Sequence, residues 1–68
     1  MKLDKAIALM LEGKVMVDSD GEFHRITIGQ YARIEFKGLR ESRWYERGFL
    51  CLDGWREATP QELKEIGL

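Results

Sequence analysis

The chain has 68 residues, with eleven lysines and arginines against twelve aspartates and glutamates, and a formal net charge of −1. This length provides one domain, 1–68, because a chain of this size buries only about 60% of its extended surface and cannot build a second core. The balanced charge gives no global field to hold a polyanion, so a long nucleic acid is not an expected partner. One cysteine excludes an internal disulfide, and Cys51 and His24 are too few for a structural zinc site, which needs about four such ligands.

Targeting signals and a membrane span are not predicted. The N-terminal residues lack the long apolar run of a signal peptide, and no stretch approaches the ~18 apolar residues of a membrane helix. We therefore expect a cytoplasmic protein with no membrane partner, no cofactor and no metal. Because small cores supply only about 3 to 5 kcal/mol, chains of this size often gain stability from self-association, and we expect a homo-oligomer.

The first predicted element is a short helix over residues 4–12. Asp4 can cap its first turn and places a negative charge at the positive end of the helix dipole. Gly13 can take the left-handed conformation that ends the helix. The apolar residues fall at helical spacing on one stripe, which must be buried: Leu3, Ala6, Ile7, Met10 and Leu11.

A hairpin is predicted next, with strands Val15–Val17 and Glu22–Ile28 around the turn Asp18–Gly21. The alternation in the second strand places His24, Ile26 and Ile28 on the inner face and Phe23, Arg25 and Thr27 on the outer face.

The next strand, Tyr31–Lys37, alternates clearly enough to indicate a half-buried antiparallel strand. Its inner side chains are predicted to be Ala32, Ile34 and Phe36. Arg43–Glu46 is predicted as a further strand. The apolar run Phe49–Leu52 indicates a central strand covered on both faces, and Asp53–Gly54 is a two-residue hairpin signal that returns the chain through residues 55–57.

A C-terminal helix is predicted from a capping box, with the hydroxyl of Thr59 at the cap, Pro60 at the first helical position and the carboxylate of Glu62 three residues after the cap. This helix should end at Gly67 and is too short to stand alone, so its apolar side chains should pack on the sheet or on a second subunit. The predicted class is α+β: an N-terminal helix on a bent antiparallel sheet of four or five strands, with SH3-like or barrel-like closure as an open alternative, and a short C-terminal helix.

Three features suggest chemistry, and each has a plain structural interpretation. No neighbouring residue supplies the partner that His24 would need as a general base, so a hydrogen-bonded structural histidine is favoured. Burial in an apolar run would raise the pKa of the Cys51 thiol and suppress its reactivity, which favours a core residue. Asp18, Asp20 and Glu22 do not follow the spacing of an EF-hand loop, so an ordinary turn is favoured over a calcium site.

Arginine and aromatic residues concentrate in the second half of the chain. Guanidinium groups bind phosphate and carboxylate, and aromatic faces stack on bases. The predicted ligand- or partner-binding residues are Arg40, Arg43, Trp44, Tyr45 and Trp55. Arg47 and Arg56 belong to the same concentration. The alternative is that both tryptophans are core or subunit-interface anchors and that the arginines pair with Glu41, Glu46 and Glu57.

Two stretches carry a family resemblance: Ala6–Val17, in which a helix runs through Gly-Lys into the first strand, and Asp53–Trp55. They resemble small phage and prophage proteins, in particular the phage anti-defence proteins that sequester the cyclic nucleotide signal of the Thoeris system. Those proteins usually have a Gly-Trp pair soon after the first strand, where this chain has residues 20–23, so no binding residue is carried over. The resemblance implies a compact helix-plus-sheet protein, often oligomeric, that acts by binding.

The leading hypothesis is therefore a non-enzymatic phage-type binding protein that captures or blocks a host component, either a host protein or a small nucleotide-like molecule. One alternative is a nucleic-acid-binding module that uses the same arginines and aromatics. Another is a structural or assembly protein with tryptophans in its subunit interface. An enzyme is the least expected class, because His24 and Cys51 have no partners that the sequence reveals.

Overall fold

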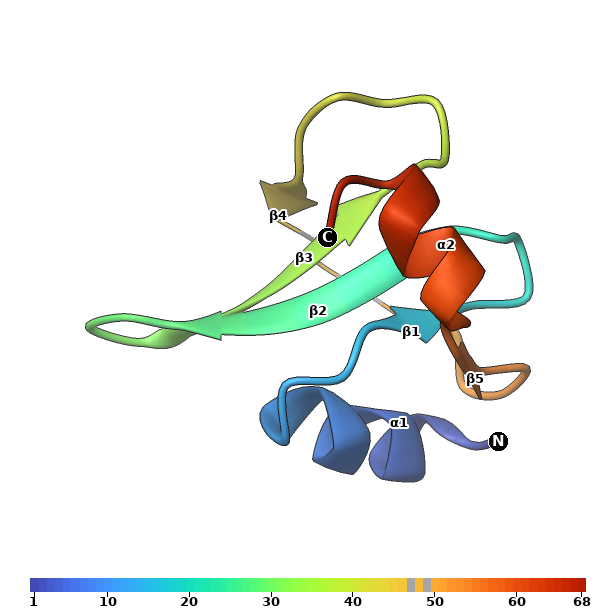
Figure 1. The fold of residues 1–68 in the computed structure, drawn as a ribbon. Coiled ribbons are helices and arrows are strands. Elements are labelled where there is room, and N and C mark those ends of the chain that lie inside the picture. The colour runs from blue at the N-terminus through green and yellow to red at the C-terminus, as the bar shows by residue number, and fades with distance from the viewer. Residues whose placement is uncertain (47, 49) are drawn as a thin grey trace.

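The computed structural model describes residues 1–46, 48 and 50–68 and has a small sheet with a helix at each end of the chain (Figure 1). Its elements are α1 (Leu3–Leu11), β1 (Met16–Val17), β2 (Phe23–Ile28), β3 (Ala32–Lys37), β4 (Tyr45–Glu46), β5 (Arg56–Glu57) and α2 (Pro60–Glu65). The strands form one antiparallel sheet in the order β4-β3-β2-β1-β5. The predicted α+β class is confirmed. Among the described residues the sheet stays open, with β4 and β5 at its edges, so it does not close into a barrel.

The sheet has a core on both of its faces where β1 and β2 pair. The register joins Met16 to His24 and Val17 to Phe23, and directly opposite residues share a face. One cluster of buried side chains lies on the α1 face and consists of Ala6, Met10, Met16 and Trp55. The other lies on the opposite, α2 face and consists of Val17, Phe23, Ala58 and Ile66. Figure 1 shows α1 and α2 on opposite sides of the sheet.

Burial along β2 and β3 differs from the predicted alternation. Phe23, predicted to face outward, is only 2% exposed, and Ile28, predicted to face inward, is 71% exposed. Lys37, which pairs with Phe23, is 5% exposed, whereas Ala32 at the other end of β3 is exposed. The reason is coverage: the helices cover both faces near β1, and the β2–β3 hairpin extends beyond them (Figure 1).

Helix α1 begins one residue before the predicted start. Lys2 is its N-cap and no side chain caps it, so the predicted cap at Asp4 is wrong. Asp4 lies inside the first turn, where its charge still interacts favourably with the helix dipole. Gly13 has φ +93°, as the predicted left-handed stop requires. Leu11 is 56% exposed, so the buried stripe is narrower than predicted.

The predicted central strand over residues 49–52 is wrong for Leu50–Leu52, which are not in a strand; Phe49 lies outside the described residues. Leu50 and Cys51 are instead partly buried and pack against the α1-face cluster, while Leu52 is 80% exposed. β5 pairs with β1 and not with this segment, so the predicted two-residue hairpin at Asp53–Gly54 is wrong, although Gly54 has a positive φ. The predicted strand over residues 43–46 is also shorter, because only β4 is formed there.

The C-terminal helix is confirmed in detail. The Thr59 hydroxyl accepts a hydrogen bond from the Glu62 backbone amide at 3.2 Å, and the Glu62 carboxylate accepts one from the Thr59 amide at 2.9 Å. Ile66 is buried and Leu63 packs beside it in the α2-face cluster, and Gly67 has φ +87°. In the described part of the chain, no helix combines the length and apolarity needed to cross a membrane.

Candidate functional site

Trp55 is a core residue. It is 2% exposed and packs with α1 in the α1-face cluster. Its indole N–H donates a hydrogen bond to the Cys51 carbonyl at 2.7 Å, and its ring meets the His24 ring edge-on at 4.7 Å between centroids. Trp55 therefore lies apart from the exposed residues with which it was grouped in the prediction.

Arg40 and Arg43 lie in the loop between β3 and β4, and both are exposed. Neither makes an ion pair with a described residue. The alternative paired the arginines with Glu41, Glu46 and Glu57, and the structure forms no such pair between described residues. Both guanidinium groups are thus available to an external anion.

Arg56 pairs with a carboxylate that the alternative did not name. Its guanidinium contacts both carboxylate oxygens of Glu62, at 2.6 and 2.7 Å. These bonds, with the backbone amide of Thr59, lower the pKa of Glu62 to about 2. The Arg56 guanidinium is therefore bonded to the first turn of helix α2. Arg47 lies outside the described residues.

Trp44 and Tyr45 lie on opposite faces of the sheet. Trp44 is half-buried against the α2-face cluster, and the Arg25 guanidinium lies 4.0 Å from its ring centroid, which is a cation–π contact. Tyr45 is 43% exposed and pairs with Phe36, whose ring lies 5.8 Å from its own. Because His24 pairs with Phe36, Tyr45 belongs to the α1 face of the sheet. The structure therefore brings Trp44 and Arg25 together but separates Tyr45 from them.

The α2 face of the hairpin adds residues that the prediction did not single out. The register pairs Thr27 with Arg33 and Arg25 with Glu35 on this face. The Arg25 Nε donates to the Glu35 carboxylate at 3.0 Å. We call the group Arg25, Arg33, Tyr31 and Trp44 the basic face. The signal was present in the sequence, because the alternation placed Arg25 and Arg33 on the same side of neighbouring strands, but it did not show that Trp44 joins them.

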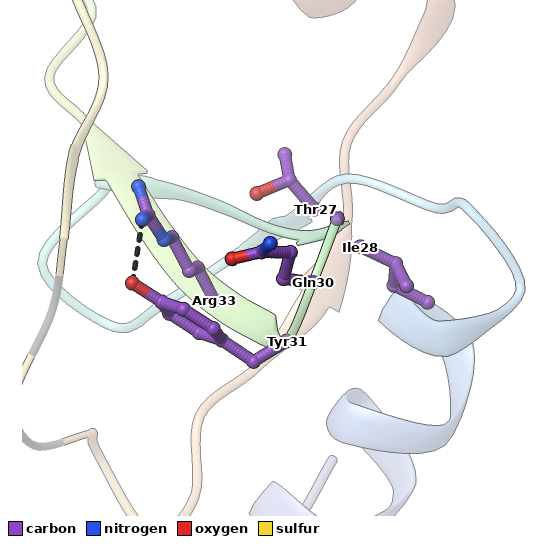
Figure 2. A pocket seen from close by; sticks show the side chains of 6 residues that line it. Thr27, Ile28, Gln30, Tyr31 and Arg33 are labelled. Atoms are coloured by element: carbon purple, nitrogen blue, oxygen red, sulfur yellow. Dashed lines mark hydrogen bonds between the residues drawn. The ribbon is translucent and has the colours of Figure 1, made fainter.

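A pocket of about 380 Å³ lies at the tip of this hairpin (Figure 2). It is lined by Thr27, Ile28, Gly29, Gln30, Tyr31 and Arg33. The Arg33 guanidinium lies 4.8 Å from the Tyr31 ring centroid and donates a hydrogen bond to the Tyr31 hydroxyl at 2.7 Å. Two arginine–aromatic contacts therefore follow one another along the basic face.

His24 is a buried structural histidine, as predicted, but it has a carboxylate partner that the sequence did not reveal. Its Nε2 lies 2.8 Å from Asp18 Oδ2, and the two side chains are 0% and 1% exposed. Asp18 Oδ1 accepts hydrogen bonds from the amides of Asp20 and Glu22 at 2.9 and 3.0 Å. Burial acts to raise the pKa of Asp18, but these hydrogen bonds and the nearby imidazole outweigh it and hold the pKa below its ordinary value. An imidazole with a carboxylate resembles a catalytic base, yet this pair offers a substrate no access.

Side chains that can bind a metal gather at the same turn. The potential ligand atoms of Asp18, Asp20 and Cys51 lie within 4.8 Å of one another. The same is true of Asp18, Glu22 and His24. The Asp18 carboxylate already accepts two backbone amides and contacts the imidazole. The residues 18–21 form the predicted turn, which explains the position of this carboxylate without an ion.

A second pocket, of about 320 Å³, lies between the α1–β1 turn and α2. Its lining includes Lys14 and Glu57 beside the apolar side chains of Val15 and Leu63. Because it holds one charge of each sign, it does not favour an anionic ligand as the basic face does.

Comparison of the chain with protein-family models, curated proteins and solved structures found no match. The resemblance to the Thoeris anti-defence proteins therefore stays a prediction.

Proposed function

We propose that this chain is a non-enzymatic binding protein of phage or prophage type that captures a host component, a small nucleotide-like anion, and thereby antagonises host defence. Its binding surface is the loop with Arg40 and Arg43 together with Trp44, and the protein works as a homo-oligomer. The observation that carries the proposal is that both loop arginines are exposed and make no ion pair with a described residue.

Chemistry supports this choice of ligand. The guanidinium fork binds phosphate oxygens in pairs, and an indole face stacks on a base. Arg25 contacts the Trp44 ring from β2, which links the loop side chain to a strand. Glu41 and Glu46 lie close to the arginines in the chain and would repel a long polyanion more than a single nucleotide.

Native mass spectrometry tests the proposal on protein purified from its expression host, with the spectrum repeated after denaturation. We expect a multimer that carries extra mass, and we expect denaturation to release that mass. The double variant Arg40→Ala/Arg43→Ala should lose the extra mass. The matched control Lys2→Ala/Lys5→Ala removes the same charge from exposed positions at α1 and should keep it.

A bare mass in the parent protein would contradict tight capture of a small ligand and would favour a host protein as partner. A monomer would contradict the homo-oligomer. Extra mass that persists in the double variant would show that the ligand lies elsewhere on the molecule.

A nucleic-acid-binding module is the second candidate, because two arginine–aromatic contacts lie along one sheet face. Stacking platforms with interleaved cations are typical of single-strand binding. The affinity for a single-stranded oligonucleotide would then fall steeply with added salt. An absence of binding at about 50 mM salt would exclude this candidate.

A further inference from the structure

The pocket at the tip of the β2–β3 hairpin is a site that the proposed function does not use. It lies between the ends of β2 and β3, in a part of the hairpin that neither helix covers (Figures 1 and 2). Its volume of about 380 Å³ is within the range of small-molecule sites.

Among the described residues that line this pocket, Arg33 alone is charged. Its guanidinium is held by Tyr31 through the ring contact at 4.8 Å and the hydroxyl at 2.7 Å. Within the described part of the chain, no carboxylate pairs with it, because Glu35 on the same face is bonded to Arg25. Arg33 is therefore oriented before any ligand arrives, and most of its N–H donors remain available.

Two neutral polar side chains lie beside Arg33. Figure 2 shows the Gln30 side chain beside Arg33 and the Thr27 hydroxyl on the same side of the hairpin, and the register pairs Thr27 directly with Arg33. Neither side chain makes a hydrogen bond with a described residue. An amide, a hydroxyl and a guanidinium in one hollow can together donate hydrogen bonds to an oxyanion.

The Tyr31 ring adds an apolar surface to the pocket, because Tyr31 is 59% exposed and belongs to the lining. Ile28 also borders the pocket, but its side chain lies on the opposite face of the hairpin from Arg33 (Figure 2). An inorganic ion would leave the Tyr31 ring in water, whereas an organic group attached to the anion would cover part of it.

We propose that the hairpin pocket binds the oxyanion of a small organic phosphate or carboxylate. Arg33 binds the anion, Gln30 and Thr27 donate further hydrogen bonds, and the Tyr31 ring contacts the organic group. This site is separate from the loop with Arg40 and Arg43. A negative result for one proposed site therefore does not contradict the proposal for the other.

Amide and arginine side-chain NMR spectra recorded during titration with phenyl phosphate test the proposal, at constant ionic strength maintained with sodium chloride. We expect saturable shifts at Gly29, Gln30 and Tyr31 and at the Arg33 side chain. Arg33→Ala should weaken binding about tenfold or more, as loss of a charge-assisted hydrogen-bond pair predicts. Arg33→Lys keeps the positive charge but lacks the guanidinium fork. Its affinity for phenyl phosphate should therefore lie between that of the parent protein and that of Arg33→Ala.

Lys5→Ala is the control, because it removes an exposed positive charge on α1, outside both proposed binding surfaces, and it should leave the shifts at the hairpin pocket unchanged. Tyr31→Phe removes the hydroxyl that orients Arg33 and should weaken binding while keeping the ring. Parallel titrations with inorganic phosphate and benzoate distinguish the sources: tighter binding of phenyl phosphate than of benzoate indicates a phosphate ester, and the reverse indicates a carboxylate. Shifts that do not saturate, that survive Arg33→Ala, or that occur instead around Arg40 and Arg43 would overturn the proposal.

Discussion

The two ends of strand β2 have opposite surroundings. At its start, Phe23 and His24 are 2% and 0% exposed, although they point to opposite faces of the sheet. At its end, Ile28 is 71% exposed. The difference arises because α1 and α2 cover the two faces beside β1, while the hairpin extends past them (Figure 1). Alternation in a strand thus predicts which residues share a face, but neighbouring elements decide which faces are buried.

This contrast divides the molecule into a covered end, where β1 and β2 pair between the helices, and a projecting end, which holds Tyr31, Arg33 and the hairpin pocket. Stability should depend on the covered end, because buried apolar area is the main favourable term in folding. The projecting end has an exposed arginine, Arg33, and an exposed aromatic residue, Tyr31, and substitutions there should change binding in the hairpin pocket more than folding. Four substitutions test this division.

The largest effect should follow from Trp55→Ala at the covered end. It removes a buried indole and its hydrogen bond to Cys51, at an expected cost of about 3–5 kcal/mol in the free energy of unfolding. Because a small core supplies about that much in total, the variant should be largely unfolded by circular dichroism. Trp44→Ala is the control, since Trp44 is only half-buried, and it should stay folded. A Trp55→Ala protein that melts like the parent would contradict the division.

Acid should destabilise the covered end through Asp18. The pKa of Asp18 is held below its ordinary value of 3.8, so its contribution to stability is fully present above that value and is lost as pH falls through the lower folded pKa. Asp18→Asn should cost about 1–3 kcal/mol at neutral pH and flatten the acid limb of the stability curve in urea titrations. Asp20→Asn, at an exposed neighbour, should leave that limb in place. An unchanged limb in Asp18→Asn would assign the acid sensitivity to another group.

A smaller effect is expected at the capping box of α2. Thr59→Ala removes the acceptor for the Glu62 amide and should cost about 1 kcal/mol in urea denaturation. Thr59→Ser keeps the hydroxyl and should recover most of the loss. Equal midpoints for the alanine and serine variants would show that the cap does not contribute.

The smallest effect should be that of Ile28→Ala at the projecting end. Because this side chain is already 71% exposed, its truncation should change the free energy of unfolding by less than about 0.5 kcal/mol. Thr27→Ala, on the same strand, measures how much a second side chain near the hairpin tip contributes to the free energy of unfolding. A loss near that of a buried isoleucine would mean that another surface covers Ile28 in solution.

Local signals were sufficient for some elements. Gly13 and the sequence from Thr59 to Glu62 define the ends of helices through contacts within a few residues, and both predictions are confirmed. Other features depend on distant partners. His24 finds Asp18 through the β1–β2 turn, and Leu50–Leu52 do not form a strand because β1 pairs with β5 instead.

The candidate site shows the same limit. Arg40 and Arg43 were predicted as binding residues from residue type alone, and the structure shows that both are exposed in a loop. Trp55 was misplaced among them, because its burial depends on α1. Arg25 was missed, because its contact with Trp44 joins residues that are far apart in the sequence.

Native-state amide hydrogen exchange measures the two ends of the sheet in one experiment and tests their division most directly. The hydrogen-bonded amides around Met16, Val17, Phe23 and His24 should exchange only through global unfolding, with the highest protection in the chain. The amides bonded across the hairpin in residues 25–28 and 32–34 should exchange about tenfold faster or more, through local opening. Equal protection along the whole hairpin would contradict the division into a stabilising covered end and a projecting end that opens locally.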